Sequence, residues 1–157
     1  MRRIRLEALV PKADAAVVFE RIRDFPRYAD HTDAVREVRV ERIDGDVLTS
    51  TWSVNFRNGL LCWRERDHID GDAMHIAFAQ IDGDFDRFDG SWQLAQVGED
   101  VTVVFVAAFD LGMPSLAAII DPIAERALRE HTEAVLRGLL GEEIVFRPHR
   151  QPEEIRS

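Results

Sequence analysis

The sequence predicts an α+β domain in which a curved antiparallel sheet of seven strands wraps around one long C-terminal helix. Apolar and polar residues alternate over residues 3–10, and alternating segments joined by short turns fill residues 35–111. Apolar residues then recur every three or four positions over residues 114–140. Because one helix cannot fill the concave face of so large a sheet, we expect an internal cavity, closed at one end by two short helices.

The first strand and the two short helices are read from the N-terminal segment. The alternating residues 3–10 form a strand that ends at Pro11. Helical spacing follows over residues 14–24 and stops before Pro26, because the residue that precedes proline is pushed out of the helical region. Proline suits the first turn of a helix, so a second short helix is expected over residues 26–31.

Short turns divide the middle of the chain into six further strands. Asp-Gly recurs at residues 44–45, 70–71 and 82–83, and Asn58-Gly59 supplies another turn. Glycine accepts the positive φ of the primed hairpin turns, so each pair favours a hairpin. The predicted strands are 35–43, 46–57, 60–69, 73–82, 86–96 and 101–111.

A long helix is predicted over residues 114–140, opened by Pro114-Ser115 and closed by Gly141. Residues 1–141 then make a single domain. The remaining residues, 142–157, hold two prolines among charges and are expected to be a loosely ordered tail. The apolar line of the helix consists of Leu116, Ile120, Ile123, Ala127, His131, Val135 and Leu139.

Composition excludes several classes of protein. The chain of 157 residues carries a formal net charge of −9, and its pI is about 5.0. An acidic chain repels nucleic-acid phosphate, so no nucleic-acid partner is expected. No apolar stretch is long enough for membrane insertion or a signal peptide. The single cysteine, Cys62, cannot form an internal disulfide, and a cytoplasmic location is the expectation.

No metal or cofactor is expected. The five histidines show no metal-ligand spacing, and Cys62 has no partner cysteine. Asp82, Asp84 and Asp86 resemble a calcium loop, but Arg87 stands where the sharp-turn glycine should be. The glycine-rich nucleotide motifs and the Gly-x-Ser-x-Gly nucleophile motif are absent from the sequence.

Two carboxylates fall on the apolar face of the predicted strand 60–69. If Trp63 and Ile69 point inward, alternation forces Glu65 and Asp67 inward as well. Desolvation beside a tryptophan would raise at least one pKa and make that residue a candidate general acid or base. The alternative is a bulge between Trp63 and Ile69, or a rim where the strand leaves the core.

Tyr28 and His131 are the other candidates for catalysis. Tyr28 lies on the short helix that should close the cavity, where its phenol could orient a ligand carbonyl or simply pack with a wet hydroxyl. His131 lies on the apolar line of the long helix, and a neutral imidazole there could move a proton. The alternative for His131 is a core histidine bonded to a backbone carbonyl.

Aromatic side chains are expected to supply the ligand-binding wall. Flat aromatic walls suit planar polycyclic or quinonoid ligands. Seven of them fall on one predicted sheet face: Trp52, Trp63, Phe78, Phe88, Trp92, Phe105 and Phe109. Arg64 and Arg66 would point outward, and the strands that carry Trp52 and Trp63 could pair edgewise in a homodimer.

The order of elements and several local strings resemble the START-like, helix-grip superfamily, also called SRPBCC. Within it, the resemblance is to the polyketide cyclase/dehydrase and coenzyme-Q-binding branch. The strings are Ala8-Leu-Val-Pro11, Asp24-Phe-Pro-Arg-Tyr28, Gly83-Asp-Phe85 leading to Gly90-Ser-Trp92, and Phe109 before the terminal helix. Related proteins often show Gly-Pro-Phe where this chain has Gly83-Asp84-Phe85.

The resemblance implies a hydrophobic cavity for a polyketide, quinone, lipid or other largely apolar molecule, with no metal or nucleotide. In similar aromatase/cyclases an arginine on the strand after the tryptophan holds the polyketide chain. Arg66 could bind substrate in that way only if the register slips by one residue, since the in-register positions are acidic.

Three functions follow from the resemblance. The first is a cofactor-independent polyketide cyclase or dehydratase that uses Glu65, Asp67, His131 and Tyr28. The second is a non-catalytic carrier or chaperone for a quinone or lipid. The third is a regulator that interacts with proteins or ribosomes.

Overall fold

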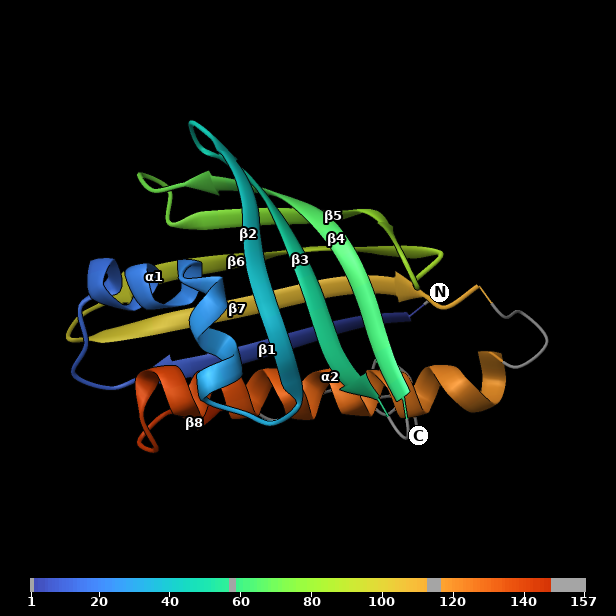
Figure 1. Ribbon diagram of the computed structural model, residues 1–157. Helices are drawn as coiled ribbons and strands as arrows, with labels where there is room; N and C mark the ends of the chain where they lie inside the picture. Colours follow the sequence, from blue (N-terminus) through green and yellow to red (C-terminus); the bar gives the residue numbers. More distant parts are fainter. Residues whose placement is uncertain (1, 57–58, 113–116, 148–157) are drawn as a thin grey trace.

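The structure is a computed structural model, which describes residues 2–56, 59–112 and 117–147. One antiparallel sheet, one long helix and two short helices make up the fold (Figure 1). In chain order the elements are β1 (Arg2–Val10), α1 (Ala15–Arg23), the 3₁₀ helix η1 (Phe25–Asp30), β2 (Val35–Asp44), β3 (Val47–Phe56), β4 (Gly59–Asp70), β5 (His75–Gly83), β6 (Arg87–Val97), β7 (Asp100–Asp110), α2 (Ala117–Leu140) and β8 (Val145–Phe146).

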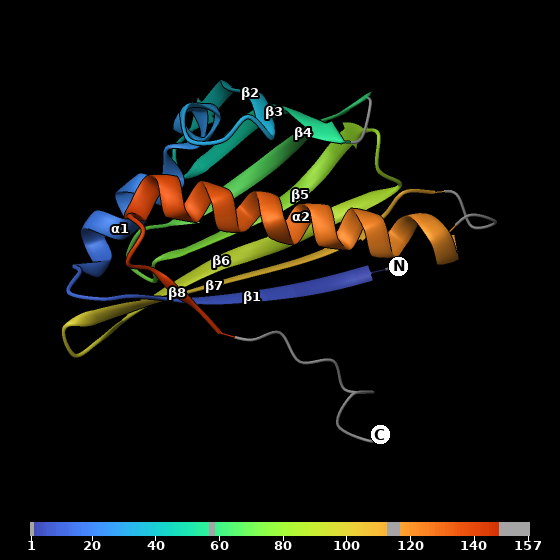
Figure 2. The same ribbon diagram turned by 90° about the horizontal axis from the view of Figure 1, so that it is seen from below.

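The sheet has the strand order β2-β3-β4-β5-β6-β7-β1-β8, so the chain runs as a meander from β2 to β7 and the first strand closes it. It curls around α2, which crosses its concave face, while α1 and η1 lie at one end (Figures 1 and 2). The predicted α+β helix-grip fold is therefore confirmed. The structure adds an eighth strand, β8, that the sequence analysis did not predict.

The N-terminal helices form for local reasons. The side chain of Asp14 caps α1 by accepting a hydrogen bond from the backbone N–H of Ala16 at 2.9 Å. Pro26 lies in the first turn of η1, where its missing N–H costs nothing. His31, the residue that ends η1, packs close to α2, because a Cβ built on Gly138 would lie 2.3 Å from the Cβ of His31. Gly138 thus lets η1 close one end of the sheet.

The Asp-Gly turns behave differently along the chain. Gly45 turns β2 into β3 with a positive φ of 62°. Gly83 instead stays paired with β4, opposite Trp63, and Ile81 is an extra residue that makes a bulge in β5. The turn predicted at Asn58-Gly59 and the helix start predicted at Pro114-Ser115 include residues outside those that the structure describes.

The C-terminal segment and the sheet edges correct two expectations. Val145 and Phe146 pair with Leu9 and Ala8 of β1, within the segment expected to be a loose tail. Residues 148–157 lie outside the described part. β3 and β4 each have a neighbour on both sides, so the edgewise dimer proposed through Trp52 and Trp63 is wrong.

The helix α2 presents a slightly different face from the predicted one. Ala124, Val135, Leu136 and Leu139 are buried against the sheet, whereas Ile123, which lies on the predicted apolar line, is 37% exposed. Among the described residues, no helix is long and apolar enough to cross a membrane.

Candidate functional site

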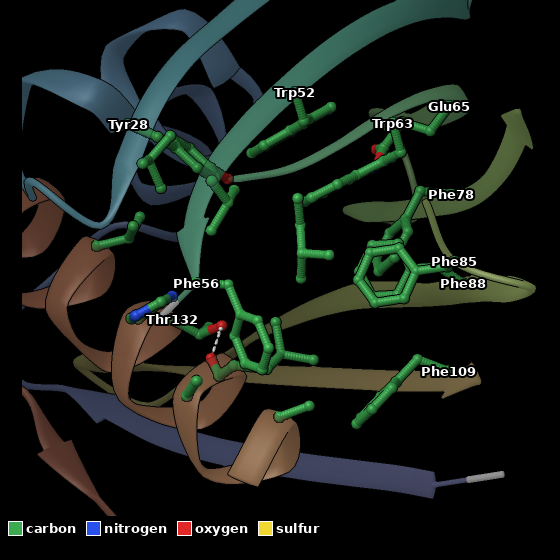
Figure 3. Close-up of a pocket in the computed structure, with 18 of the residues that line it drawn as sticks. Tyr28, Trp52, Phe56, Trp63, Glu65, Phe78, Phe85, Phe88, Phe109 and Thr132 are labelled. Atoms are coloured by element: carbon green, nitrogen blue, oxygen red, sulfur yellow. Dashed lines mark hydrogen bonds between the residues drawn. The ribbon is translucent and has the colours of Figure 1, made fainter. Parts of the chain in front are cut away.

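A cavity of about 100 Å³ lies between the concave face of the sheet and α2 (Figure 3). The long meander strands supply one wall, and α2 and η1 supply the other. The lining is mainly aromatic and aliphatic: Phe25, Tyr28, Val35, Trp52, Val54, Asn55, Phe56, Leu61, Trp63, Glu65, Phe78, Phe85, Phe88, Trp92, Phe105, Phe109, Ala124, Ala127, Leu128, His131, Thr132 and Val135.

A stacked pair of tryptophans forms the centre of the sheet wall. Trp52 of β3 and Trp63 of β4 are directly opposite in the strand register, so their indoles stack with ring centroids 5.8 Å apart and an interplanar angle of 3°. Trp63 also meets Phe85 and Phe88 edge-on, with centroid distances of 5.4 and 5.2 Å. The result is an aromatic wall in which the two indoles are parallel and the two phenyl rings stand edge-on to Trp63.

The structure places all seven predicted aromatic residues on the cavity wall: Trp52, Trp63, Phe78, Phe88, Trp92, Phe105 and Phe109. Their contact with a ligand stays a prediction.

Glu65 and Asp67 do point to the concave side. Burial alternates without interruption from Trp63 to Ile69, and the pairing of β4 with β3 shows no bulge in this segment. Glu65 is 3% exposed and lines the cavity, whereas Asp67 is 0% exposed and does not reach the cavity surface. The rim and the β4 bulge considered above are therefore wrong.

One hydrogen bond from a neighbouring side chain holds each of the two carboxyls. The indole N–H of Trp63 donates to Oε1 of Glu65 at 2.7 Å, and the hydroxyl of Ser50 donates to Oδ2 of Asp67 at 2.6 Å. Ser50 in turn accepts from the indole N–H of Trp52 at 2.9 Å. The tryptophan pair thus shapes the cavity and also orders the buried acids.

Burial raises the pKa of Glu65 well above its ordinary value, and the neighbouring charge of Asp67 raises it further. Burial also raises the pKa of Asp67, but the hydrogen bonds from Glu65 and Ser50 oppose the shift. Of the two carboxyls, Glu65 is therefore the one whose protonated form its surroundings favour more. A neutral carboxyl in a dry site can donate or relay a proton.

α2 brings a second titratable group to the cavity. His131 lines it in a half-buried position, and burial lowers the pKa of its imidazole. None of the hydrogen bonds found among the described residues involves the His131 ring, so the expected alternative of a backbone-bonded core histidine is not observed. A neutral imidazole with a free ring nitrogen can accept a proton from a bound molecule.

Tyr28 lines the cavity as well, but its hydroxyl is engaged. It donates to the backbone carbonyl oxygen of Ile22 at 2.6 Å, and burial raises the pKa of the phenol well above its ordinary value. The ring meets Phe25 and Trp52 edge-on, with centroids 5.8 and 5.5 Å away. Tyr28 therefore fixes η1 against the wall and holds its proton within the protein.

Arg66 requires a correction. Its side chain is exposed on the convex face of β4, together with Arg64 and His68, because the register with β3 does not slip. Its predicted contact with a ligand in the cavity is therefore wrong. No arginine or lysine occurs among the described residues that line the cavity.

Several contributors to the site were not among the candidate residues chosen from the sequence, although alternation puts Ser50 and Phe56 on the apolar face of their strand. Thr132 and Phe56 line the cavity. Ser50 does not line it, but holds Asp67 in place by a hydrogen bond. Thr132 follows His131 on the helix, so a wider apolar face would have included it. Ser50 alternates with Trp52, which was the signal available for a polar residue on the inner face.

The described residues contain no group of three or more His, Cys, Asp and Glu side chains that could hold a metal ion. The lining offers aromatic faces and one carboxyl rather than the clustered donors that a metal or a phosphate requires. The arrangement suits the binding and protonation of a largely apolar organic molecule.

Comparison with known proteins assigns the chain to a family. The family model described as "Polyketide cyclase / dehydrase and lipid transport" matches residues 11–136. The chain belongs to this family. No curated protein matches its sequence closely enough to count as a relative.

Solved structures show the same fold. TTHA0849 of Thermus thermophilus is 24% identical, with a TM-score of 0.81 over 88% of this chain and 94% of that one. The Zhui aromatase/cyclase of a Streptomyces species is 18% identical, with a TM-score of 0.78 over 90% and 92%. A START superfamily protein of Mycobacterium smegmatis is 14% identical, with a TM-score of 0.72 over 88% and 95%. At these identities the likeness concerns the fold alone.

Proposed function

We propose that this protein is a cofactor-independent cyclase or dehydratase that acts on an uncharged, oxygen-bearing polycyclic or polyketide-like intermediate. The observation that carries the proposal is that a buried Glu65 on the sheet and a half-buried His131 on α2 line one aromatic cavity, where burial raises the pKa of the carboxyl and lowers the pKa of the imidazole. The family match and the fold likeness to an aromatase/cyclase support the same reaction class.

The two groups suit a dehydration whose product, a cyclic enone, becomes aromatic when it loses a further ring C–H proton and gains one on the ketone oxygen, which gives the phenol. His131 takes the proton from the carbon beside a ketone, and the electron pair of that C–H bond forms the new C=C bond. Glu65 gives its proton to the hydroxyl on the next carbon, whose C–O bond breaks and releases water. Exchange with solvent returns the proton from imidazolium to the carboxylate. General acid and base steps of this kind contribute about 10²–10⁴-fold each.

The aromatic wall contributes by confinement. The parallel rings of Trp52 and Trp63, together with the phenylalanines of the wall, restrict how a flexible precursor can fold, which keeps it in a conformation near that of the product. The rate should fall at acidic pH, as His131 becomes protonated, and at alkaline pH, as Glu65 loses its proton.

The test is turnover of a bicyclic β-hydroxy ketone, followed by the absorbance of the aromatic product. Glu65→Gln and His131→Gln should each lower kcat by about 100-fold or more. Arg66→Ala, on the opposite face of β4, is the matched control and should retain the wild-type rate. Wild-type turnover that survives both Gln substitutions would overturn the proposal.

A carrier for a quinone or lipid is the second candidate, favoured by the predominantly apolar lining of the cavity. A carrier would bind long prenylated quinones tightly, with an affinity independent of pH, and would show no turnover. Titration with prenylated quinones and polycyclic phenols between about pH 5 and pH 9 separates the two functions, since this range spans the ordinary titration of histidine.

A further inference from the structure

Hydroxyl groups on the cavity wall donate their hydrogens to the protein. The hydroxyl of Tyr28 donates to the carbonyl oxygen of Ile22 at 2.6 Å, and that of Thr132 donates to the carbonyl oxygen of Leu128 at 2.7 Å. Each hydroxyl has only one hydrogen, so both present only oxygen lone pairs to a bound molecule. Figure 3 shows the Thr132 bond and the position of both residues on the wall.

The two indoles are occupied in the same way. Trp52 donates its N–H to Ser50 at 2.9 Å, and Trp63 donates its N–H to Glu65 at 2.7 Å. An indole has no second donor. Both tryptophans therefore offer a ligand their ring faces and no hydrogen.

The proton of Glu65 has a partner inside the protein as well. Oδ2 of Asp67 accepts from Ser50, while Oδ1 is buried and accepts no hydrogen bond from the N–H and O–H donors of the described residues. A hydrogen bond from protonated Glu65 to Asp67 removes this unsatisfied oxygen. With no substrate hydroxyl beside it, Glu65 then faces the cavity with lone pairs, and Asp67 keeps a negative charge behind it. In the proposed dehydration the proton leaves this bond to Asp67 and passes to the hydroxyl that departs as water.

Few donors remain in the described lining. His131 has one ring N–H. Asn55, which is exposed, keeps one amide hydrogen, because the other is donated to the carbonyl oxygen of Asp33 at 2.6 Å. No described lining residue is an arginine or lysine. Acceptors from Tyr28, Glu65 and Thr132 thus outnumber the free donors.

We propose that the cavity selects uncharged hydroxyaromatic or enolic molecules over ketones, ethers and anions with the same ring skeleton. A phenol or enol O–H can donate to these unused lone pairs, whereas a carbonyl or ether oxygen finds few donors. An anion meets the unbalanced charge of Asp67 in a low-dielectric site. The inference builds on the proposed dehydration, because such a site holds the enol and the phenolic product more tightly than the ketone.

Three neutral probes of similar shape test the selectivity: a dihydroxynaphthalene, its dimethyl ether and a tetralone. The Kd values are measured by isothermal titration calorimetry at neutral pH. The Kd of the diol should be lower than those of the other two probes by a factor of about ten or more, as expected for a hydrogen bond to the negatively charged pair of Glu65 and Asp67. Equal affinities, tighter binding of the ether or tetralone, or no saturable binding of any probe would overturn the proposal.

Glu65→Gln distinguishes this inference from the proposed function. The glutamine N–H replaces the acid O–H toward Asp67, and its oxygen still accepts from Trp63, so the preference for the diol should persist. Turnover should nevertheless be lost, because an amide has no proton to transfer. A folded Gln variant that binds diol and ether equally would overturn the inference, whereas wild-type protein that prefers the diol but converts no ketone would overturn only the proposed reaction.

Thr132→Val tests the helix side. The loss of its acceptor oxygen should reduce the preference for the diol several-fold. Thr102→Val is the matched control, because the hydroxyl of Thr102 also points to a backbone carbonyl, that of Ala95, but lies outside the cavity. Identical preferences in the two variants would contradict the acceptor role of Thr132.

Discussion

The two faces of β4 carry alternating charged residues in opposite environments. On the convex face, Arg64 forms an ion pair with Asp82 at 2.9 Å, and both side chains are largely exposed. On the concave face, Glu65 and Asp67 are buried among aromatic rings, two residues apart on one strand. Neighbouring residues of β4 therefore differ in their surroundings: one side chain contacts water, and the next is buried away from it.

The difference shows that the face of the sheet, rather than the residue type, decides what a carboxyl can do. Exposed ion pairs contribute about 0–1 kcal/mol because water screens them. Glu65 and Asp67 have no described cation bonded to them, so burial changes their pKa and one proton balances the pair. Hydrogen bonds from Ser50 and Trp63 then give each carboxyl a definite role.

The largest effect on stability should come from separating the buried pair of Glu65 and Asp67. Asp67→Ala removes the acceptor of Ser50 and the partner of Glu65, and it leaves a small void. We expect the free energy of unfolding to fall by about 3 kcal/mol, since buried donors lose their partner. Urea denaturation measures it. Asp82→Ala, on the outer face, is the matched control and should cost less than about 1 kcal/mol.

A second test concerns the close contact between Gly83 of β5 and Trp63 of β4. Gly83 has a φ of 149°, and a Cβ built there would lie 2.4 Å from the Cβ of Trp63. Gly83→Ala should destabilise the protein by about 2 kcal/mol and weaken binding of planar ligands, because β4 and β5 must separate. Gly71→Ala, whose added Cβ meets nothing within 4 Å, is the control for thermal unfolding. Equal melting temperatures would contradict the close packing.

The pH dependence of stability sharpens the comparison further. Burial raises the pKa of Glu65, so between its unfolded pKa of about 4.3 and the raised folded pKa, the unfolded chain releases a proton that the folded chain keeps. Stability from this residue is full below the unfolded pKa and falls as pH rises through that window. The slope is at most about 1.4 kcal/mol per pH unit for one proton.

Glu65→Gln has no proton to lose, so its stability relative to the wild type should increase as pH rises above the unfolded pKa. Carboxyls that do not contact Glu65 are common to both proteins and cancel in the difference. Asp67 keeps a hydrogen-bond donor in the variant, because the glutamine N–H replaces the acid O–H of Glu65. Denaturation of both proteins at several pH values measures it, and a difference that stays constant with pH would contradict a protonated Glu65.

The smallest effect on stability is expected on the convex face of β4. Arg66→Ala should change the free energy of unfolding by no more than about 0.5 kcal/mol, because the side chain is exposed. The affinity of the diol probe should also stay the same. A clear loss of affinity would show that Arg66 reaches the ligand after all.

The sequence was sufficient for most of the fold. Alternation placed β4 and its two inward-facing acids correctly, because successive side chains of a strand point to opposite faces of the sheet. The turn at residues 82–83 was misread, because Asp-Gly favours a hairpin locally while pairing with Trp63 keeps Gly83 in the sheet. β8 was missed because two residues carry no periodicity.

The site was predicted less completely. The aromatic wall followed from alternation, but the bond between Tyr28 and the Ile22 carbonyl depends on how η1 folds back on α1. The roles of Ser50 and Thr132 depend on hydrogen-bond direction, which residue spacing does not encode. Arg66 was considered for the cavity through the family resemblance, while its own position on the strand indicated the outer face.

The most direct test of a protonated Glu65 beside an ionised Asp67 is infrared spectroscopy of the carboxyl groups at neutral pH. Spectra of the wild type are compared with those of Glu65→Gln and Asp67→Asn. We predict a C=O band of a protonated carboxylic acid in the wild type that disappears in Glu65→Gln. Absence of that band from the wild type, or its survival in Glu65→Gln, would contradict the proton assignment on which the proposed acid chemistry depends.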